Sequence, residues 1–279
     1  MGKFDGILIC TDLDGTLLKN DKSISYENIE AIEYFKREGG YFTFVTGRMP
    51  FFVSYVLETI KPNAPFGCVN GAGLYDGIKG KYVWKSVMPD NVIELVKYID
   101  DIFENIGIQV NTFYKTYFCR ENRAMENFRK VTNLENLVCN YNDVKESIAK
   151  ILFASESDEE IRHIEKMLKS HPLSNEFDFI RSEKTLYEIL PKGIGKGTAI
   201  INLCHHLNIS TNKTIAIGDY NNDISMFEAA GIGIAVSNAC KEALDAADYI
   251  TVSNEEHAIA RVVCDLELGK YNLIKIKDR

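Results

Sequence analysis

The sequence predicts an α/β protein in which a doubly wound parallel sheet forms the core and an α+β domain is inserted into it. Strand-like and helix-like segments alternate over the first 75 residues and again after Pro191, which favours parallel strands joined by helical crossovers. Between these stretches the pattern changes to amphipathic helices and pairs of β runs. We therefore assign residues 1–86 and 189–279 to the core domain and residues 87–188 to the inserted domain.

The first part of the core has clear start and stop signals. The apolar run Ile7-Leu8-Ile9-Cys10 predicts a buried strand. The helix that follows has Ile29, Ile32 and Phe35 on one face, Ser25 as its N-cap and a Gly-Gly pair as its stop. The expected elements are strands at 6–11, 41–46 and 66–69, helices at 26–38 and 50–60, and a hairpin at 72–86.

The inserted domain begins with an amphipathic helix through Leu95, Val96 and Ile99. Ser157 and Glu160 form a capping box that opens another helix. The helix opened by this capping box is expected near 158–169, and the strands of the insert are expected near 108–119, 148–154, 177–182 and 185–190. After it, helices are expected at 196–207, 222–230, 239–246 and 255–267, strands at 213–218, 232–236 and 249–252, and a solvated tail at 275–279.

Composition excludes several classes of partner. With 32 basic and 40 acidic residues and a net charge of −8, the chain lacks the electrostatic footprint of a protein that binds nucleic acid or an anionic membrane. Its seven cysteines form no C-x-x-C pair, so we expect small core residues in a reducing cytoplasm. The residues before the first strand lack the basic and apolar segments of a signal peptide, so none is expected, and no apolar run reaches about 18 residues. A soluble cytoplasmic protein is expected, and its oligomeric state is not readable.

Asp12 and Asp14 stand two residues apart at the end of the first strand, before Gly15. Two carboxylates in different environments can divide a metal-assisted reaction, one as nucleophile and the other as proton donor and acceptor. A turn capped by aspartate is the simpler alternative. An EF-hand calcium loop is excluded, because Leu17 and Ser23 stand where its glycine and glutamate belong.

Two cationic segments are candidates for binding an anion. Thr46-Gly47-Arg48 follows an apolar strand, where a hydroxyl, backbone N–H groups and a guanidinium can bind phosphate oxygens, although Thr and Gly also serve as an ordinary cap and turn. Lys196 begins a helix, a position that the helix dipole disfavours for a cation. Nearby carboxylates and phosphate would explain this lysine, and a solvated side chain is the alternative. A Walker loop is excluded, because Gly197 replaces the required Ser or Thr.

The segment Gly218-Asp219-Tyr220-Asn221-Asn222-Asp223 ends one strand and opens a helix. Helix capping explains one of its polar side chains but not all of them. Carboxylates and amides gathered at a strand end suit Mg²⁺, which takes one or two protein carboxylates together with phosphate and water. A calcium loop fails here too, because Ile224 and Ala230 replace the required Gly and Glu.

Together, these motifs resemble in order and spacing the four motifs of the haloacid dehalogenase superfamily. The residues that carry the resemblance are Asp12-Leu13-Asp14-Gly15-Thr16, Thr46-Gly47-Arg48, Lys196 and Gly218-Asp219-x-x-Asn222-Asp223-x-x-Met226. Asn70-Gly71-Ala72 and the long insert resemble the Cof-type branch, subfamily IIB, which has a C2 cap. One departure is Ala235-Val236-Ser237-Asn238-Ala239, where many relatives have Met-Gly-Asn-Ala.

The resemblance implies a Rossmann-like core, a mobile C2-type cap and Mg²⁺-dependent phosphoryl transfer. Asp12 is then the nucleophile and Asp14 the general acid and base. The metal ligands are Asp12, the backbone carbonyl of Asp14 and Asp219, with Asp223 supporting them from outside the ligand set. The phosphate is held by Thr46, Gly47, Lys196 and Asn222, together with Arg48 and Asn70.

We expect a phosphatase that hydrolyses small phosphomonoesters, such as sugar phosphates, through an aspartyl-phosphate. A second carboxylate favours phosphate esters over halides, because a departing halide needs no proton. Two alternatives stay open: a phosphomutase with the same nucleophile, and a catalytically silent protein that binds phosphorylated metabolites. The expected partner is a small phosphorylated metabolite, and the polar residues of the insert that select it cannot be identified from the sequence.

Overall fold

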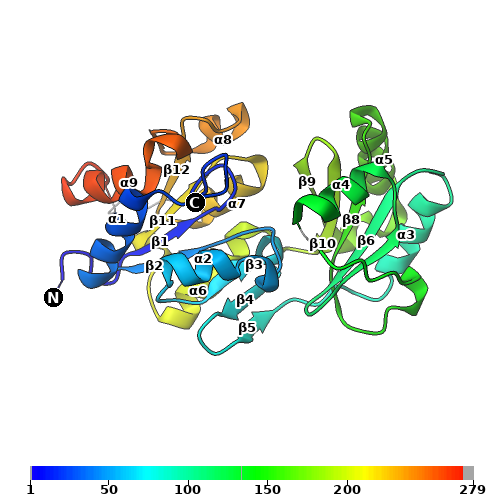
Figure 1. Ribbon diagram of the computed structural model, residues 1–279, viewed down its shortest axis with the longest axis horizontal. Helices are drawn as coiled ribbons and strands as arrows, with labels where there is room; N and C mark the ends of the chain where they lie inside the picture. Colours follow the sequence, from blue (N-terminus) through cyan, green and yellow to red (C-terminus); the bar gives the residue numbers. More distant parts are fainter. Residues whose placement is uncertain (1, 133, 273–279) are drawn as a thin grey trace. The chain divides into compact units, whose positions relative to one another are not determined.

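The computed structural model describes residues 2–132 and 134–272. The chain forms two compact units, Met1–Lys85 with Gly195–Arg279 and Ser86–Ile194 (Figure 1). The first unit contains both ends of the chain, and the second, green in Figure 1, is built from one continuous segment. The tail expected at 275–279 lies outside the described residues.

The first unit is built on a five-stranded parallel sheet. Its strand order is β13-β12-β11-β1-β2, so β1 is paired on both sides, with Leu8 opposite Thr214 on one side and Tyr41 on the other. All neighbouring strands in this order are parallel, which requires crossover connections even between strands that follow one another in the chain, such as β1 and β2. The strands are β1 (Leu8–Thr11), β2 (Tyr41–Phe44), β11 (Thr214–Gly218), β12 (Ile232–Val236) and β13 (Tyr249–Thr251).

Helices pack on both faces of this sheet. Leu8 and Cys10 of β1 pack in one apolar cluster with Leu203 of α6 (Lys196–Leu207) and Phe227 of α7 (Ile224–Ala229). Successive strand residues point to opposite faces, so buried Ile9 faces the other side. There α1 (Tyr26–Arg37) contacts β2 and α9 (Ala258–Glu267). Helix α8 (Lys241–Ala246) packs beside α7. The predicted doubly wound α/β core is therefore confirmed.

Two local predictions for the core were only partly right. The strand expected at 66–69 is present as β3 (Phe66–Cys68), and a parallel bridge between Val45 and Gly67 joins it to the end of β2. Its full pairing, however, is antiparallel, in a separate sheet with β4 (Gly73–Asp76) and β5 (Lys81–Lys85) from the next segment of chain. The helix expected at 50–60 is broken at Val53 into a 3₁₀ turn, Pro50–Phe52, and α2 (Ser54–Ile60).

The second unit is an antiparallel sheet with helices on both faces. Ile151 and Phe153 pack with α3 (Val92–Asp100) and α5 (Asp158–Ser170), whereas Leu152 and Ala154 pack beside α4 (Arg123–Thr132). Ser157 caps α5 as expected, accepting a hydrogen bond from the backbone N–H of Glu160. The strand order is β7-β6-β8-β10-β9, with β6 (Gly107–Thr112), β7 (Thr116–Arg120), β8 (Ile148–Ala154), β9 (Phe177–Glu183) and β10 (Leu186–Pro191).

Helix α4 was not predicted, and the cysteine prediction was only partly right. Four charged residues among the ten of α4 leave only a short apolar face around Met125, too brief for a clear helical period. All seven cysteines are free, but Cys10, Cys68 and Cys204 alone are buried, and Cys264 is exposed. Within residues 2–132 and 134–272, no helix has the length and apolar character needed to cross a membrane.

Candidate active site

The site lies at the carboxyl end of the parallel sheet. Asp12 directly follows β1, and its backbone N–H donates to the carbonyl of Ile217 in β11, which fixes the end of one strand against the other. The loop then turns at Gly15, whose φ is +79°. A Cβ on Gly15 would lie 2.5 Å from Oδ2 of Asp219, so glycine is required both by the backbone and by the close approach.

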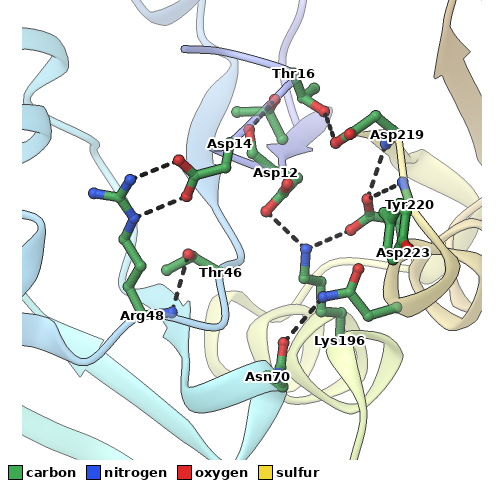
Figure 2. A network of polar contacts seen from close by, with 12 residues as sticks. Asp12, Asp14, Thr16, Thr46, Arg48, Asn70, Lys196, Asp219, Tyr220 and Asp223 are labelled. Carbon is green, nitrogen blue, oxygen red and sulfur yellow. Dashed lines mark hydrogen bonds and ion pairs between the residues drawn. The ribbon is translucent and has the colours of Figure 1, made fainter. Parts of the chain in front are cut away.

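Lys196 joins two carboxylates in a buried position. Its Nζ donates to Oδ1 of Asp12 at 2.7 Å and to Oδ1 of Asp223 at 2.5 Å (Figure 2). The side chains of Lys196 and Asp223 are 2% and 0% exposed. Burial acts to lower the pKa of Lys196, but the two carboxylates outweigh it and raise that pKa. The ammonium at the start of α6 is therefore a charged partner of the acid cluster and not a solvated lysine.

Asp223 and Asp219 are held differently. Oδ2 of Asp223 accepts from the backbone N–H groups of Asp219 at 2.9 Å and Tyr220 at 3.0 Å, so both its oxygens are bonded. Asp219 accepts from Oγ1 of Thr16 at 2.8 Å. Burial, and then the charge of Asp223, raises the pKa of Asp219 to about 6. Burial likewise raises the pKa of Asp12 well above its usual range, despite Lys196.

The acid cluster fits a divalent cation. Asp12, Asp219 and Asp223 each place one carboxylate oxygen within 4.8 Å of the others. Lys196 is one cation among three carboxylates, and burial, followed by repulsion from the neighbouring carboxylates, raises the pKa values of Asp12 and Asp219. Mg²⁺ prefers oxygen ligands and one or two protein carboxylates. The carboxylate oxygens of the cluster match that preference. Asp12 and Asp219 are suited to bind the cation, and Asp223 orients Lys196 and the loop at Asp219 and Tyr220.

Asp14 lies apart from this cluster and is bound by two cations. Arg48 donates from Nε to Oδ2 at 2.8 Å and from Nη2 to Oδ1 at 2.6 Å, a bidentate pair (Figure 2). Lys22 donates to Oδ1 at 2.8 Å. Burial acts to raise the pKa of Asp14, but these two cations outweigh it and lower that pKa. The two acids of the motif therefore have opposite electrostatic environments.

The remaining predicted residues, Thr46, Gly47, Asn70 and Asn222, are brought together by direct contacts. Thr46 accepts from the backbone N–H of Arg48 through Oγ1, and its carbonyl accepts from the N–H of Asn70. Asn222 donates through Nδ2 to Oδ1 of Asn70 at 3.2 Å. A Cβ on Gly47 would lie 2.9 Å from that same Oδ1, so the absence of a side chain lets the two loops approach. Three segments far apart in the sequence thus meet beside the acid cluster (Figure 2).

The turn that carries Asn70 has an unusual backbone. Val69 and Asn70 have φ values of +54° and +52°, in the left-handed region that a β-branched residue such as Val rarely adopts. Strain of this kind is concentrated at functional sites, where the surrounding structure imposes it. It places the buried side chain of Asn70 against Asn222.

Sequence reasoning missed several supporting residues. Asn238 donates to the carbonyl of Gly15 at 2.8 Å, and Asn254 donates to the carbonyl of Leu18 at 3.0 Å. The backbone N–H of Asn254 in turn donates to Oδ1 of Asn238 at 3.0 Å. These contacts fix the loop after Asp12 from a segment more than two hundred residues away. The available signal for Asn238 was that it matches the Asn of the relatives' Met-Gly-Asn-Ala, although the residues before it differ, whereas nothing local marks Asn254 or Lys22.

The profile of the haloacid dehalogenase-like hydrolases matches residues 9–263, nearly the whole described chain. The chain belongs to this family. The predicted resemblance to the superfamily and its Cof-type branch is confirmed, and this protein is a hydrolase. Among related sequences, the 5-amino-6-(5-phospho-D-ribitylamino)uracil phosphatase YwtE of Bacillus subtilis is 29% identical over 291 residues, covering 94% of this chain and 99% of that protein. Phosphatase YwpJ of Bacillus subtilis is 27% identical over 286 residues, covering 92% and 98%.

Solved structures agree with the fold of this hydrolase. A haloacid dehalogenase-like hydrolase from Bacillus subtilis has a TM-score of 0.80 and 26% identity, covering 93% of this chain and 99% of that one. A sugar phosphatase of haloacid dehalogenase subclass IIB has a TM-score of 0.82 at 21% identity, covering 95% and 100%. The second likeness shows the fold, a Rossmann-like core with an inserted cap of the subclass IIB kind.

Proposed function

We propose that this hydrolase is a Mg²⁺-dependent phosphatase that cleaves small phosphomonoesters, such as sugar phosphates, through an aspartyl-phosphate on Asp12. The observation that carries the proposal is Lys196, a buried ammonium 2.7 Å from Asp12 and 2.5 Å from Asp223. A buried cation beside a carboxylate nucleophile offers an incoming phosphate a counter-charge at the point of attack. Membership of the family and the phosphatase names of its relatives support the same activity.

In this mechanism the two acids of the first motif act in sequence. A carboxylate oxygen of Asp12 attacks phosphorus as the bond to the leaving oxygen breaks, and Asp14 gives that oxygen a proton. Water then attacks the phosphorus, Asp14 takes its proton, and inorganic phosphate leaves Asp12 restored. To donate or accept a proton, Asp14 must give up at least one of its contacts with Arg48 and Lys22.

The metal would be held by Asp12, Asp219 and the backbone carbonyl of Asp14, with Asp223 supporting them. When bound, Mg²⁺ supplies positive charge that offsets the repulsion between the nucleophile and the phosphate oxygens. Lys196 holds the Asp12 carboxylate in place, and Asp223 holds Lys196. Thr46, Gly47, Asn70 and Asn222 are proposed to bind the transferred phosphate together with Lys196. Arg48, for which the sequence predicts the same role, is bonded to both oxygens of Asp14 and is proposed to act on that side of the site.

We also propose that the second unit is the cap that selects the substrate. The proposed division is residues 1–86 and 189–279 for the core and 87–188 for the cap. Every catalytic and phosphate-binding residue named above belongs to the first unit, Met1–Lys85 with Gly195–Arg279. Selection of the leaving group by a separate unit would allow the chemistry and the specificity to vary independently.

The test is release of inorganic phosphate from p-nitrophenyl phosphate by the purified protein with and without Mg²⁺. We expect metal-dependent turnover, and a loss of at least about a thousandfold in Asp12→Asn, because the nucleophile is removed. Asp245→Asn, which alters an exposed carboxylate of the core paired with Lys241, is the control and should retain activity. Equal rates for wild type and Asp12→Asn would contradict the proposal.

Product analysis distinguishes transfer of the phosphoryl group to water from its transfer back to the substrate. With a hexose 1-phosphate, a phosphatase yields free hexose and inorganic phosphate, whereas a mutase yields an isomeric hexose phosphate without free phosphate. A phosphoryl group found on Asp12 after acid quenching would support the covalent intermediate. Tight binding of phosphorylated metabolites without turnover at any Mg²⁺ concentration would instead indicate a binding protein.

A further inference from the structure

The loop that follows the catalytic motif is anchored on the core. Asn254 donates to the carbonyl of Leu18, and Glu255 accepts from the backbone N–H of Asn20 at 2.7 Å. The loop is closed internally, because the N–H of Lys19 donates to the carbonyl of Ser23 at 2.9 Å. Lys22 is therefore carried by a fixed turn, which limits where its side chain can reach.

The backbone of Lys22 is in a costly conformation. Its φ is +66°, in the left-handed region where Gly or Asn is the usual residue. This conformation lets its N–H donate to the carbonyl of Lys19 at 2.9 Å while its Nζ reaches Oδ1 of Asp14 at 2.8 Å. A strained residue that keeps a long cationic side chain beside a reactive carboxylate indicates that the side chain has a role.

Neutralising Asp14 is not a sufficient role for Lys22. Arg48 already donates to both oxygens of Asp14. The side chain of Lys22 is 58% exposed and that of Asp14 is 40% exposed, and ion pairs with such exposure contribute little to stability. Lys22 and Arg48 thus both bind the partly exposed carboxylate of Asp14, although the protein as a whole has a net charge of −8.

We propose that Lys22 and Arg48 together bind an anionic group, a carboxylate or a second phosphate, on the leaving-group side of the substrate. The inference rests on the proposed phosphatase function, in which Asp14 meets the leaving oxygen. A cation 2.8 Å from Asp14 then lies beside the leaving group and not beside the transferred phosphate. When Asp14 gives up these contacts to handle the proton, an anion on the leaving group replaces it as their partner.

The experiment compares matched substrates that differ by one anionic group. Glycerol 3-phosphate and 3-phosphoglycerate differ by a carboxylate, and fructose 6-phosphate and fructose 1,6-bisphosphate differ by a phosphate. We expect the wild type to have the higher kcat/KM for the anionic member of one pair, and the pair identifies the group. Lys22→Met should reduce that preference about tenfold, mainly through KM, because one charge-assisted hydrogen bond is lost. Lys22→Arg should keep most of it.

The control is Lys3→Met. Lys3 forms an ion pair with Glu267 in the same unit, and the two side chains are 56% and 38% exposed, close to the values for Lys22 and Asp14. Lys3→Met should leave the ratio of kcat/KM values within each substrate pair unchanged. Lys22→Gly provides a second variant, since glycine suits the left-handed turn and removes the charge without straining the loop. It should lose the preference as Lys22→Met does.

Two results separate this inference from the proposed function. Hydrolysis with no preference in either pair, or with a preference that Lys22→Met and Lys22→Gly leave unchanged, overturns the role of Lys22 alone. Failure of the wild type to hydrolyse p-nitrophenyl phosphate and all four substrates with Mg²⁺ overturns the phosphatase proposal and this inference with it.

Discussion

At the scale of single residues, the two acids of the first motif differ because their neighbours differ. Asp12 is buried beside Lys196, and burial together with the other carboxylates raises its pKa. Asp14 is partly exposed, and Arg48 and Lys22 hold its pKa below the usual range despite burial. One carboxylate is thus placed among acids and the other among cations, although they are two residues apart in the chain. This contrast supports separate roles for them.

The separate roles predict a dependence on the leaving group. Asp14→Asn removes the proposed proton donor, so turnover of alkyl phosphates should fall about 100- to 10,000-fold, whereas aryl phosphates with good leaving groups should lose much less. The measurement is kcat/KM across phosphate esters of graded leaving-group pKa for wild type and variant. Asp12→Asn is the comparison and should lose activity on every ester. Equal losses for Asp14→Asn across the series would contradict its role as an acid.

At the scale of elements, the site depends on parallel strands that end at one edge. Asp12 follows β1 and Asp219 follows β11, and these strands are paired in register from Leu8 with Thr214 to Thr11 with Ile217. Helix α6 then brings Lys196 to the same edge. The second unit uses an antiparallel sheet, in which one face carries charge as well as apolar residues. There Lys150 of β8 donates to Glu188 of β10 at 2.9 Å.

This pair predicts a large effect on the stability of the second unit. The side chains of Lys150 and Glu188 are only 8% and 4% exposed. Glu188→Gln removes the carboxylate to which Lys150 donates at 2.9 Å in a buried position, which should cost about 3–5 kcal/mol of unfolding free energy in urea denaturation. The double variant Lys150→Met/Glu188→Gln should recover part of that loss.

An exposed pair of the same unit provides the reference for this prediction. Lys130 and Glu126 are one turn apart on α4, and Glu126→Gln should cost less than about 1 kcal/mol. Lys150→Met completes the double-mutant cycle, and a double variant whose loss equals the sum of the Glu188→Gln and Lys150→Met losses would show that the two charges do not interact.

At the scale of the whole molecule, acidic residues outnumber basic ones both in the chain as a whole and within the candidate site. The chain carries a net charge of −8, and the site itself gathers three carboxylates around one buried ammonium. Folding therefore forces negative charges together in the first unit, at a free-energy cost that a bound cation would reduce. The second unit contributes none of these groups.

That cost predicts how Mg²⁺ and pH act together on stability. The pKa of Asp219 is raised from 3.8 to about 6, so its ionised form opposes folding: the penalty is absent below about pH 4 and complete above pH 6. Mg²⁺ binds the ionised form. Its stabilising effect on the melting temperature, measured against EDTA, should therefore be larger at pH 7.5 than at pH 5.

Asp219→Asn tests the assignment of this pH dependence. The variant removes one titrating group that is also a proposed ligand, so the Mg²⁺-induced shift should shrink and depend less on pH, with the remaining dependence due to Asp12, whose pKa is also raised. An equal shift at pH 5 and pH 7.5 in the wild type would contradict the link between the acid cluster and metal binding.

The sequence was a good guide where the signals were local or repeated. The helix at 196–207 and the strands at 148–154 and 232–236 coincide with α6, β8 and β12. It was less reliable where a competing partner decided the pairing, as in β3, which pairs with β4 and is joined to the parallel sheet by one bridge at Gly67. It also failed at α4, whose few apolar residues gave too short a period.

By itself, the sequence determined the α/β class, the family and the residue types of the site, because strand and helix periods and closely spaced motifs are written into short stretches of chain. Only the tertiary structure decided which groups meet. Arg48 and Lys22 bind Asp14, Lys196 joins Asp12 to Asp223, and Asn254 holds the loop at Leu18. These contacts join residues that are up to 236 positions apart, and they form because the parallel sheet brings the ends of its strands to one edge.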